Sequence, residues 1–238
     1  MSRRAITPFL SIILPVLDEA ALLDDRLAAL EVYRRRGAEI LVVDGGSRDG
    51  TPVIARPAVD RVLESPRGRA TQMNAGAAAS RGEVLLFLHA DTQLPPDADT
   101  AIRRALAEDR AVWGRFDVRI DSTHLLLRVV ESLMNRRSRW SGIATGDQAI
   151  FVRREAFLAV GGFPELPLME DIALSKRLKR LARPACLRER VRTSGRRWER
   201  HGVLRTILLM WSLRLGYFLG ADPRWLAIRY GYTPRERE

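Results

Sequence analysis

The sequence predicts an α/β fold in which a mostly parallel central sheet is flanked by helices. Short apolar runs alternate with segments of helical periodicity, turn signals separate them, and 46% of the 238 residues are hydrophobic. Strands that alternate with helices pair in parallel through right-handed crossovers. We therefore expect a single domain over residues 1–238, in which residues 199–238 form a C-terminal helical extension.

The first half of the chain contains the most regular elements. The expected strands are residues 10–16, 39–44, 60–64 and 83–88. A helix is expected over residues 19–36, because apolar side chains recur there every three or four positions and Gly37 follows where a helix C-cap belongs. Residues 97–108 are expected to form another helix.

The second half is less regular. Residues 111–120 and 146–153 resemble strands, with a helix expected between them at residues 122–137. A further helix is expected over residues 171–181, with its apolar residues facing inward: Ile172, Leu174, Leu178 and Leu181.

Two apolar stretches have alternative interpretations. The first, near the N-terminus, follows Arg3 and Arg4, as the apolar region of a signal peptide would. Pro15, Asp18 and Glu19 come directly after it, and no small-residue cleavage site is present, so a buried strand is favoured. The second, residues 203–220, is as long as the shortest membrane spans. Arg205 and Arg214 interrupt it, and an arginine near the centre of a span costs about 2.5–3.5 kcal/mol. A packed or an interfacial helix is therefore expected.

The chain is strongly basic, with a net charge of +11, and Lys176 and Lys179 are its only lysines. Such a surface attracts phosphates of nucleotides, nucleic acids or anionic lipids. The interleaving of aromatic and basic residues that single-stranded nucleic acids require is absent, so no nucleic-acid partner is expected. Cys186 is the only cysteine, which excludes an internal disulfide and fits a reducing cytoplasm.

Carboxylates follow the ends of several expected strands. Asp18 and Glu19 follow the first strand, Asp44 ends the second, and Asp91 lies just past the fourth. The carboxyl ends of parallel strands line one crevice, where ligands bind. Carboxylates that gather there repel one another unless a cation compensates them. Mg²⁺ or Mn²⁺, bound by one or two carboxylates and by substrate phosphates, would do so. The alternative is that each aspartate only forms a turn or caps a helix.

Two segments favour contact with a diphosphate. Residues 44–52 (Asp-Gly-Gly-Ser-Arg-Asp-Gly-Thr-Pro) form a glycine-rich loop that can approach a ligand closely, with Ser47 and Asp49 available to hydrogen-bond the turn. Arg67 and Arg69 stand at the start of a small-residue helix before the fourth strand, where the helix dipole assists anion binding. Solvated surface arginines are the alternative.

Glu170 and Asp171 are adjacent carboxylates at the start of an expected helix. The helix dipole favours acidic residues in a first turn, so capping is one interpretation. The other is a general base, which needs a carboxylate within hydrogen-bond reach of an acceptor hydroxyl.

Together these segments resemble glycosyltransferase family 2, whose Rossmann-like fold is called GT-A. Residues 13–19 (Ile-Leu-Pro-Val-Leu-Asp-Glu) resemble its first-strand signature, with Asp18 in place of the usual asparagine. Residues 43–51 resemble its Asp-Asp-Gly-Ser-x-Asp-Gly-Thr motif, with Gly45 in place of the second aspartate. Further matches follow in the family's order: residues 74–76, 89–91, 146–148, 170–171 and 196–198. The combination also resembles a small bacterial subfamily linked with arsenosugar or selenium-related gene sets.

The resemblance implies inverting, metal-assisted transfer from a UDP- or GDP-sugar to the hydroxyl or phosphate of a small molecule or a lipid phosphate. It implies donor contacts by Pro15, Asp18, Glu19, Asp44, Gly46, Ser47, Asp49, Arg69, Asn74, Ala90 and Asp91. It places on the acceptor and sugar side Gly146, Asp147, Gln148, Arg197 and Trp198. Asp171, beside Glu170, would be the catalytic base. Asp91 would hold Mg²⁺ or Mn²⁺, and His89 is a weaker candidate ligand.

Two other functions remain as alternatives. A sugar-nucleotide-forming nucleotidyltransferase would share the sheet and the metal, but Asp18 and Glu19 stand where its glycine-rich loop would follow the first strand. A basic nucleic-acid-binding module would account for the charge alone. We expect a cytoplasmic protein, and residues 203–220 together with the positive charge favour peripheral contact with the inner face of the membrane.

Overall fold

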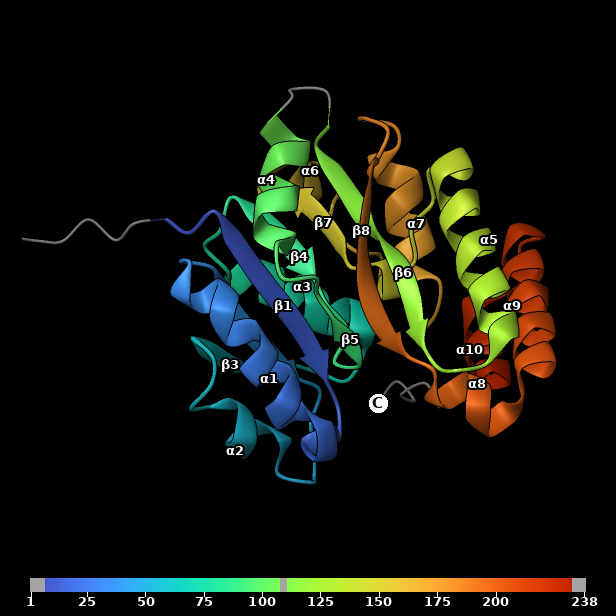
Figure 1. Cartoon of the computed structure of the whole chain (residues 1–238), viewed down its shortest axis with the longest axis horizontal. Coiled ribbons are helices and arrows are strands. Elements are labelled where there is room, and N and C mark those ends of the chain that lie inside the picture. Colours follow the sequence, from blue (N-terminus) through green and yellow to red (C-terminus); the bar gives the residue numbers. More distant parts are fainter. Residues whose placement is uncertain (1–6, 108–110, 233–238) are drawn as a thin grey trace, which may run out of the picture.

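The computed structural model describes residues 7–107 and 111–232, and within them one central sheet has the strand order β3-β2-β1-β4-β7-β6-β8-β5 (Figure 1). Its strands are β1 Leu10–Val16, β2 Glu39–Asp44, β3 Arg61–Glu64, β4 Val84–Phe87, β5 Thr92–Gln93, β6 Trp113–Asp121, β7 Ile150–Arg153 and β8 Ala185–Ser194. The strands from β3 to β4 pair in parallel. Strand β7 joins antiparallel to β4 and β6, and β6 pairs in parallel with β8. The short β5 is antiparallel to β8.

Helices cover both faces of this sheet (Figure 1). They are α1 Ala20–Arg35, α2 Thr51–Ala55, α3 Arg69–Ala79, α4 Ala98–Ala107, α5 Leu125–Ser141, α6 Arg154–Ala159, α7 Glu170–Leu178, α8 Arg196–His201, α9 Val203–Phe218 and α10 Pro223–Tyr230. Residues Gly146–Gln148 form the short 3₁₀ helix η1.

Most expected elements are present, and β1 and β2 have the expected bounds. The expected helix over residues 97–108 is α4, and Glu108 lies outside the described residues. The expectation for residues 146–153 was partly wrong: they begin with η1, and only Ile150–Arg153 is a strand. Leu181 was also placed wrongly, because α7 ends before it and its side chain is 52% exposed. Strand β8 was not expected.

Alternation along β1 divides the core between the two faces of the sheet. Ile12 and Leu14 pack with buried leucines of α1, whereas Ile13 packs with the small residues of α3. This alternation follows from the two-residue period of a strand. Both faces are covered, so β1 reads as a continuous apolar run, as strands buried on both faces do.

The C-terminal helices pack beside α5 and α7 (Figure 1). Leu213 of α9 and Leu226 of α10 pack on Ile172 of α7 in a separate apolar cluster. Helix α9 also contacts α5 through Val203 and Leu127. None of the helices within residues 7–107 and 111–232 combines the length and the apolarity that crossing a bilayer requires.

The close approach of α3 to the sheet generates a stability prediction. A Cβ atom on Gly76 would lie 2.4 Å from Cγ2 of Ile13 and 2.9 Å from Cγ2 of Val43. We expect Gly76→Ala to lower the free energy of unfolding by about 1–3 kcal/mol, because overpacking outweighs the higher helix propensity of alanine. Denaturant unfolding measures the change. Ala78→Val adds bulk on the exposed side of the same helix and should cost less than about 1 kcal/mol. A Gly76→Ala protein as stable as wild type would contradict this packing.

Candidate active site

A cavity of about 470 Å³ opens at the carboxyl ends of β1 and β4 and extends toward α7 and α9. Its lining includes Pro15, Glu19, Arg69, His89, Ala90, Asp91, Gly146, Asp147, Glu170, Asp171, Arg197, Trp198, Arg214 and Tyr230. Beside it lies a hollow of about 510 Å³ that includes Asp18, Gly46 and Arg48 and shares Leu17 and Arg67 with the cavity. The strand ends therefore meet at a crevice, as the fold class predicts.

The loop after β2 is organised by its own carboxylates. Asp44 is 3% exposed, and its Oδ2 accepts hydrogen bonds from the amides of Gly46 and Ser47, at 2.9 and 3.0 Å. Asp49 accepts from the amides of Ala20 at 2.9 Å and Thr51 at 3.0 Å. The Thr51 hydroxyl contributes most to holding the pKa of Asp49 below its ordinary value. Asp44, Ser47 and Asp49 thus shape the loop and lie outside the lining of both hollows.

Two polar residues of α3 tie other segments together. Gln72 is buried, and its Nε2 donates to the carbonyls of Val16 at 2.9 Å and Val43 at 2.8 Å. A Cβ atom on Gly45 would lie 3.0 Å from the Gln72 side chain, which accounts for glycine at that position. Asn74 exchanges two hydrogen bonds with the backbone of Phe163, at 2.9 and 3.0 Å, and does not line the cavity. Gln72 was not predicted to have a role, although it is the one large amide in a run of small residues.

Asp91 and Glu19 enter the cavity from neighbouring strand ends. Burial raises the pKa of Glu19, and the negative charge of Asp91 raises it further, as expected for two nearby carboxylates. The described residues contain no cluster of three or more histidine, cysteine, aspartate or glutamate side chains that could hold a metal ion. One or two carboxylates suit Mg²⁺ or Mn²⁺ when substrate phosphates complete the coordination.

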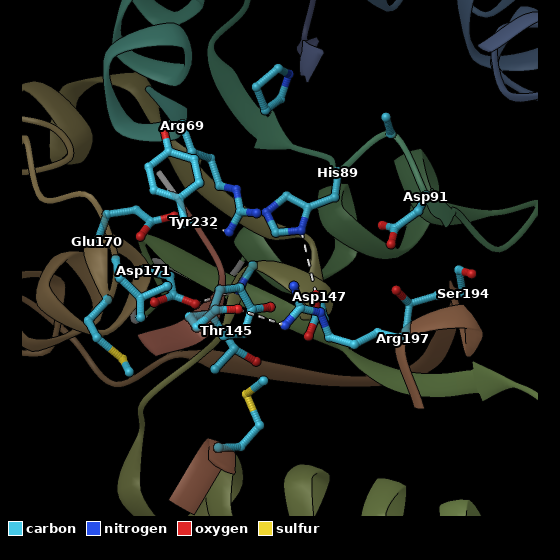
Figure 2. A pocket seen from close by; sticks show the side chains of 18 of the residues that line it. Arg69, His89, Asp91, Thr145, Asp147, Glu170, Asp171, Ser194, Arg197 and Tyr232 are labelled. Carbon is cyan, nitrogen blue, oxygen red and sulfur yellow. Dashed lines mark hydrogen bonds and ion pairs between the residues drawn. The ribbon is translucent and has the colours of Figure 1, made fainter. Parts of the chain in front are cut away.

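His89 lies against Asp147 and Gly146 (Figure 2). Its Nδ1 is 3.6 Å from Oδ1 of Asp147. Burial acts to raise the pKa of Asp147, but His89 and Arg69 outweigh it and hold that pKa below its ordinary value. A Cβ atom on Gly146 would lie 2.2 Å from Cε1 of the imidazole, so only glycine leaves room for this ring. His89 therefore faces Asp147, which was predicted for the acceptor side, and its role as a metal ligand stays a prediction.

Two backbone amides orient the carboxylate of Asp171, which lines the cavity. Its Oδ2 accepts from the amide of Gly146 at 2.8 Å, and its Oδ1 accepts from the amide of Ile172 at 2.7 Å. Its neighbour Glu170 is only 3% exposed and lies 3.5 Å from Nη1 of Arg69. Burial raises the pKa of Glu170, although the charge of Arg69 opposes this. Figure 2 shows both carboxylates on the same wall of the cavity.

The C-terminal helices complete the lining of the cavity. The guanidinium of Arg197 lies 3.8 Å from the centre of the Tyr230 ring, and Trp198, which also lines the cavity, packs against the apolar cluster between α5 and α9. Tyr230 and Arg214 also line the cavity but were not predicted, because no local motif marks them. Gln148 is fully buried: its Oε1 accepts from the amide of Thr145 at 3.2 Å, so it holds η1 in place and does not line the cavity.

The sequence is similar to known glycosyltransferases. The family model described as glycosyl transferase family 2 matches residues 11–161. The undecaprenyl-phosphate 4-deoxy-4-formamido-L-arabinose transferase of Pseudomonas paraeruginosa is 31% identical over 156 residues, which are 60% of this chain and 45% of that protein. This chain spans less than half the length of the curated relatives it matches.

Solved structures share the fold. The mannosyltransferase PcManGT from Pyrobaculum calidifontis, in complex with GDP-Man and Mn²⁺, aligns with a TM-score of 0.63 and 22% identity, over 95% of this chain and 66% of that one. S. aureus TarS 1-349 in complex with UDP aligns with a TM-score of 0.66 and 17% identity, over 78% of this chain and 60% of that one. The fold is therefore GT-A, as the sequence resemblance implied.

Glu170 generates a prediction about stability and pH. Burial raises the pKa of its carboxyl above the ordinary value of 4.5, so the folded protein holds this proton more tightly than the unfolded chain does. The stability that this group contributes is complete below pH 4.5 and is lost as pH rises through the folded-state pKa. We expect Glu170→Gln to lose less thermal stability than wild type when the pH is raised from 4.5 to neutrality.

The control is Glu155→Gln, at an exposed position of α6, whose melting temperature should follow wild type at every pH. If the melting temperatures of Glu170→Gln and wild type changed with pH in parallel, the Glu170 carboxyl would not be the group that causes the loss of stability.

Proposed function

This chain belongs to glycosyl transferase family 2, and we propose that it transfers a sugar from a nucleotide-sugar donor to an acceptor with inversion at the anomeric carbon. One observation carries the proposal: Asp91, Arg69 and Asp171 line the same cavity from three different elements. They combine a metal-binding carboxylate, a cation for a diphosphate and a base in one space.

The donor is proposed to bind across both hollows. The hollow that includes Asp18 and Gly46 would take the nucleoside, and the cavity would take the diphosphate and the sugar. Arg69 would contact the diphosphate, and Asp91 would hold Mg²⁺ or Mn²⁺ against it. The bound cation would supply charge neutralisation on the leaving group. UDP and GDP are both candidate donor nucleotides.

Asp171 is proposed to act as the general base. Two backbone amides orient its carboxylate, which leaves lone pairs on both oxygens for an acceptor hydroxyl. The acceptor oxygen would form its bond to the anomeric carbon while the bond to the nucleoside diphosphate breaks on the opposite face. Asp171 would receive the proton, and Arg69 would stabilise the charge that develops on the leaving group. A single displacement through an oxocarbenium-like transition state inverts the anomeric centre.

Positive charge near Asp171 favours an acceptor that carries a phosphate or another anionic group. Arg214 lines the cavity, and the neighbouring Arg137 has two buried nitrogens, Nε and Nη2, without a hydrogen-bond partner. Burial, and then the charge of Arg214, lowers the pKa of Arg137 to about 10. Both a phosphorylated small molecule and a lipid phosphate fit this chemistry.

Donor binding can be tested by thermal-shift titration with UDP, GDP, CDP and dTDP, each with Mn²⁺ and with EDTA. We expect a metal-dependent rise with one nucleotide, because a ligand at 100 times its Kd stabilises the folded state by about 2.7 kcal/mol. Asp91→Ala should remove most of the metal-dependent part of the shift. Asp25→Ala, at an exposed position of α1, should leave it unchanged. Absence of a shift with all four nucleotides would contradict the proposed donor site.

Turnover tests the base. We expect Asp171→Asn to lower kcat by about 10²–10⁴-fold while the nucleotide-induced thermal shift persists, because the lost interaction belongs to proton transfer. Release of nucleoside diphosphate from the matching sugar donor, with undecaprenyl phosphate as the acceptor probe, measures kcat. Asp25→Asn is the matched control. Near-wild-type turnover in Asp171→Asn would remove Asp171 from this role, and release of pyrophosphate instead would favour a nucleotidyltransferase.

A further inference from the structure

Large apolar side chains are exposed on three neighbouring helices at one end of the molecule. Helix α9 carries a stripe at intervals of three and four residues, which lie on one side of a helix. The exposed apolar residues of the three helices are Leu125, Leu126, Val129, Leu133, Trp140, Leu204, Leu208, Trp211, Leu215, Phe218, Trp225 and Ile228. We refer to this set as the α5/α9/α10 face.

The three helices are contiguous in the fold. Helices α5 and α9 pack on each other through a small apolar cluster, and α9 contacts α10. Figure 1 shows them grouped at the end of the molecule opposite α1 and α2. The apolar residues of this face that remain exposed are therefore on the outer sides of helices whose inner sides are already packed. Contiguous apolar surface of this kind marks an interaction site.

Positive charge accompanies the apolar residues. Residues 125–141 and 196–230 contain eleven arginines and three acidic residues, a formal net charge of +8 out of +11 for the whole chain. Arg136, Arg205, Arg224 and Arg229 are exposed, and none of them forms a salt bridge within the part of the chain that the structure describes. The partner of this face must therefore offer both apolar depth and negative charge.

We propose that the α5/α9/α10 face docks onto the surface of an anionic lipid bilayer. Trp140, Trp211 and Trp225 are 85%, 64% and 53% exposed, and tryptophan and arginine favour the boundary between headgroups and acyl chains. Helices with an apolar side and arginines on their flanks lie in the plane of that boundary. A second copy of this chain fits less well, because two such faces would bring arginines against arginines with few carboxylates to pair them.

Docking would place the cavity beside the headgroups. Met210, Leu213 and Arg214 of α9 and Tyr230 of α10 line the cavity from the same helices whose outer sides form the face. An acceptor phosphate carried by a lipid would then reach the arginines of the cavity without leaving the bilayer surface. This consequence rests on the proposed function, whereas the docking itself does not.

Sedimentation with vesicles tests the docking with the full chain. We expect the protein to bind vesicles of phosphatidylglycerol and phosphatidylcholine but not vesicles of phosphatidylcholine alone, and to be released by high salt. The double variant Leu208→Glu/Trp211→Glu should lower the partition coefficient at least about tenfold, because it places charge within the apolar stripe. Val53→Glu and Leu158→Glu make the same kind of change at exposed positions of α2 and α6 and should bind as wild type does.

A second double variant tests the contribution of positive charge to vesicle binding separately from that of the apolar residues. Arg205→Gln/Arg229→Gln keeps every apolar residue and should weaken binding to the anionic vesicles with a shallower salt dependence. Each variant is checked by its nucleotide-induced thermal shift, which the outer residues of these helices should not alter. Vesicle binding without a nucleotide shift in wild type would count against the donor site alone.

Three results would overturn the docking. The first is a wild-type protein that does not bind the anionic vesicles although it gives the nucleotide shift. The second is a Leu208→Glu/Trp211→Glu protein that binds as tightly as wild type. The third is a wild-type dimer in light scattering that this variant converts to a monomer without any change in vesicle binding, which would assign the face to a second copy.

Discussion

Hydrogen bonds between aspartate carboxylates and backbone amides hold the loops on which the cavity depends. The carboxylate of Asp49 accepts from Ala20, that of Asp18 accepts from Arg48 at 2.8 Å, and that of Asp171 accepts from Gly146. Each bond joins segments that are 25 to 30 residues apart in the chain. A charged acceptor makes such a bond roughly twice as strong as a neutral one. The acidic residues of the site therefore have an architectural role as well as a proposed chemical one, and an asparagine, which keeps one carbonyl acceptor, is a better probe of chemistry than an alanine.

The charges of the cavity are consistent with the metal-bound diphosphate proposed as its ligand. Glu19 and Asp91 repel each other, and burial together with this repulsion keeps the pKa of Glu19 raised. Arg197 and Arg214 also line the cavity, and neither forms a salt bridge within the described residues. A divalent cation would compensate the negative charge of the two carboxylates, and a phosphate group would compensate the positive charge of the two arginines. A nucleotide sugar with its metal would bring both at once, so donor binding would offset both imbalances.

The sequence predicted the elements whose signal is local and missed those that depend on tertiary contacts. Strands β1 and β2 are buried on both faces and read as unbroken apolar runs, so their bounds were found. Strand β8 was missed because three consecutive charged residues, Arg188 to Arg190, separate its buried Leu187 and Val191 and interrupt the alternation that marks a strand. Because the carboxyl ends of parallel strands meet at one edge of the sheet, Asp91 and Glu19 were expected to lie close together, and they do. Nothing local marks Tyr230 or Arg214, which reach the cavity only because α9 and α10 fold back onto α7.

The distribution of charge along the molecule links the cavity to the α5/α9/α10 face. The first 107 residues supply the carboxylates proposed for the donor side, whereas residues 125–141 and 196–230 carry a formal net charge of +8. Helix α9 contributes Leu213 and Arg214 to the cavity and Leu208 and Trp211 to the outer face. A surface that attracts anionic lipid would thus orient the molecule as well as bind it, because the charge and the apolar residues lie at the same end. The acceptor side of the cavity would face the bilayer and the nucleotide side would stay open to water, which is the arrangement that a lipid-linked acceptor and a soluble donor require.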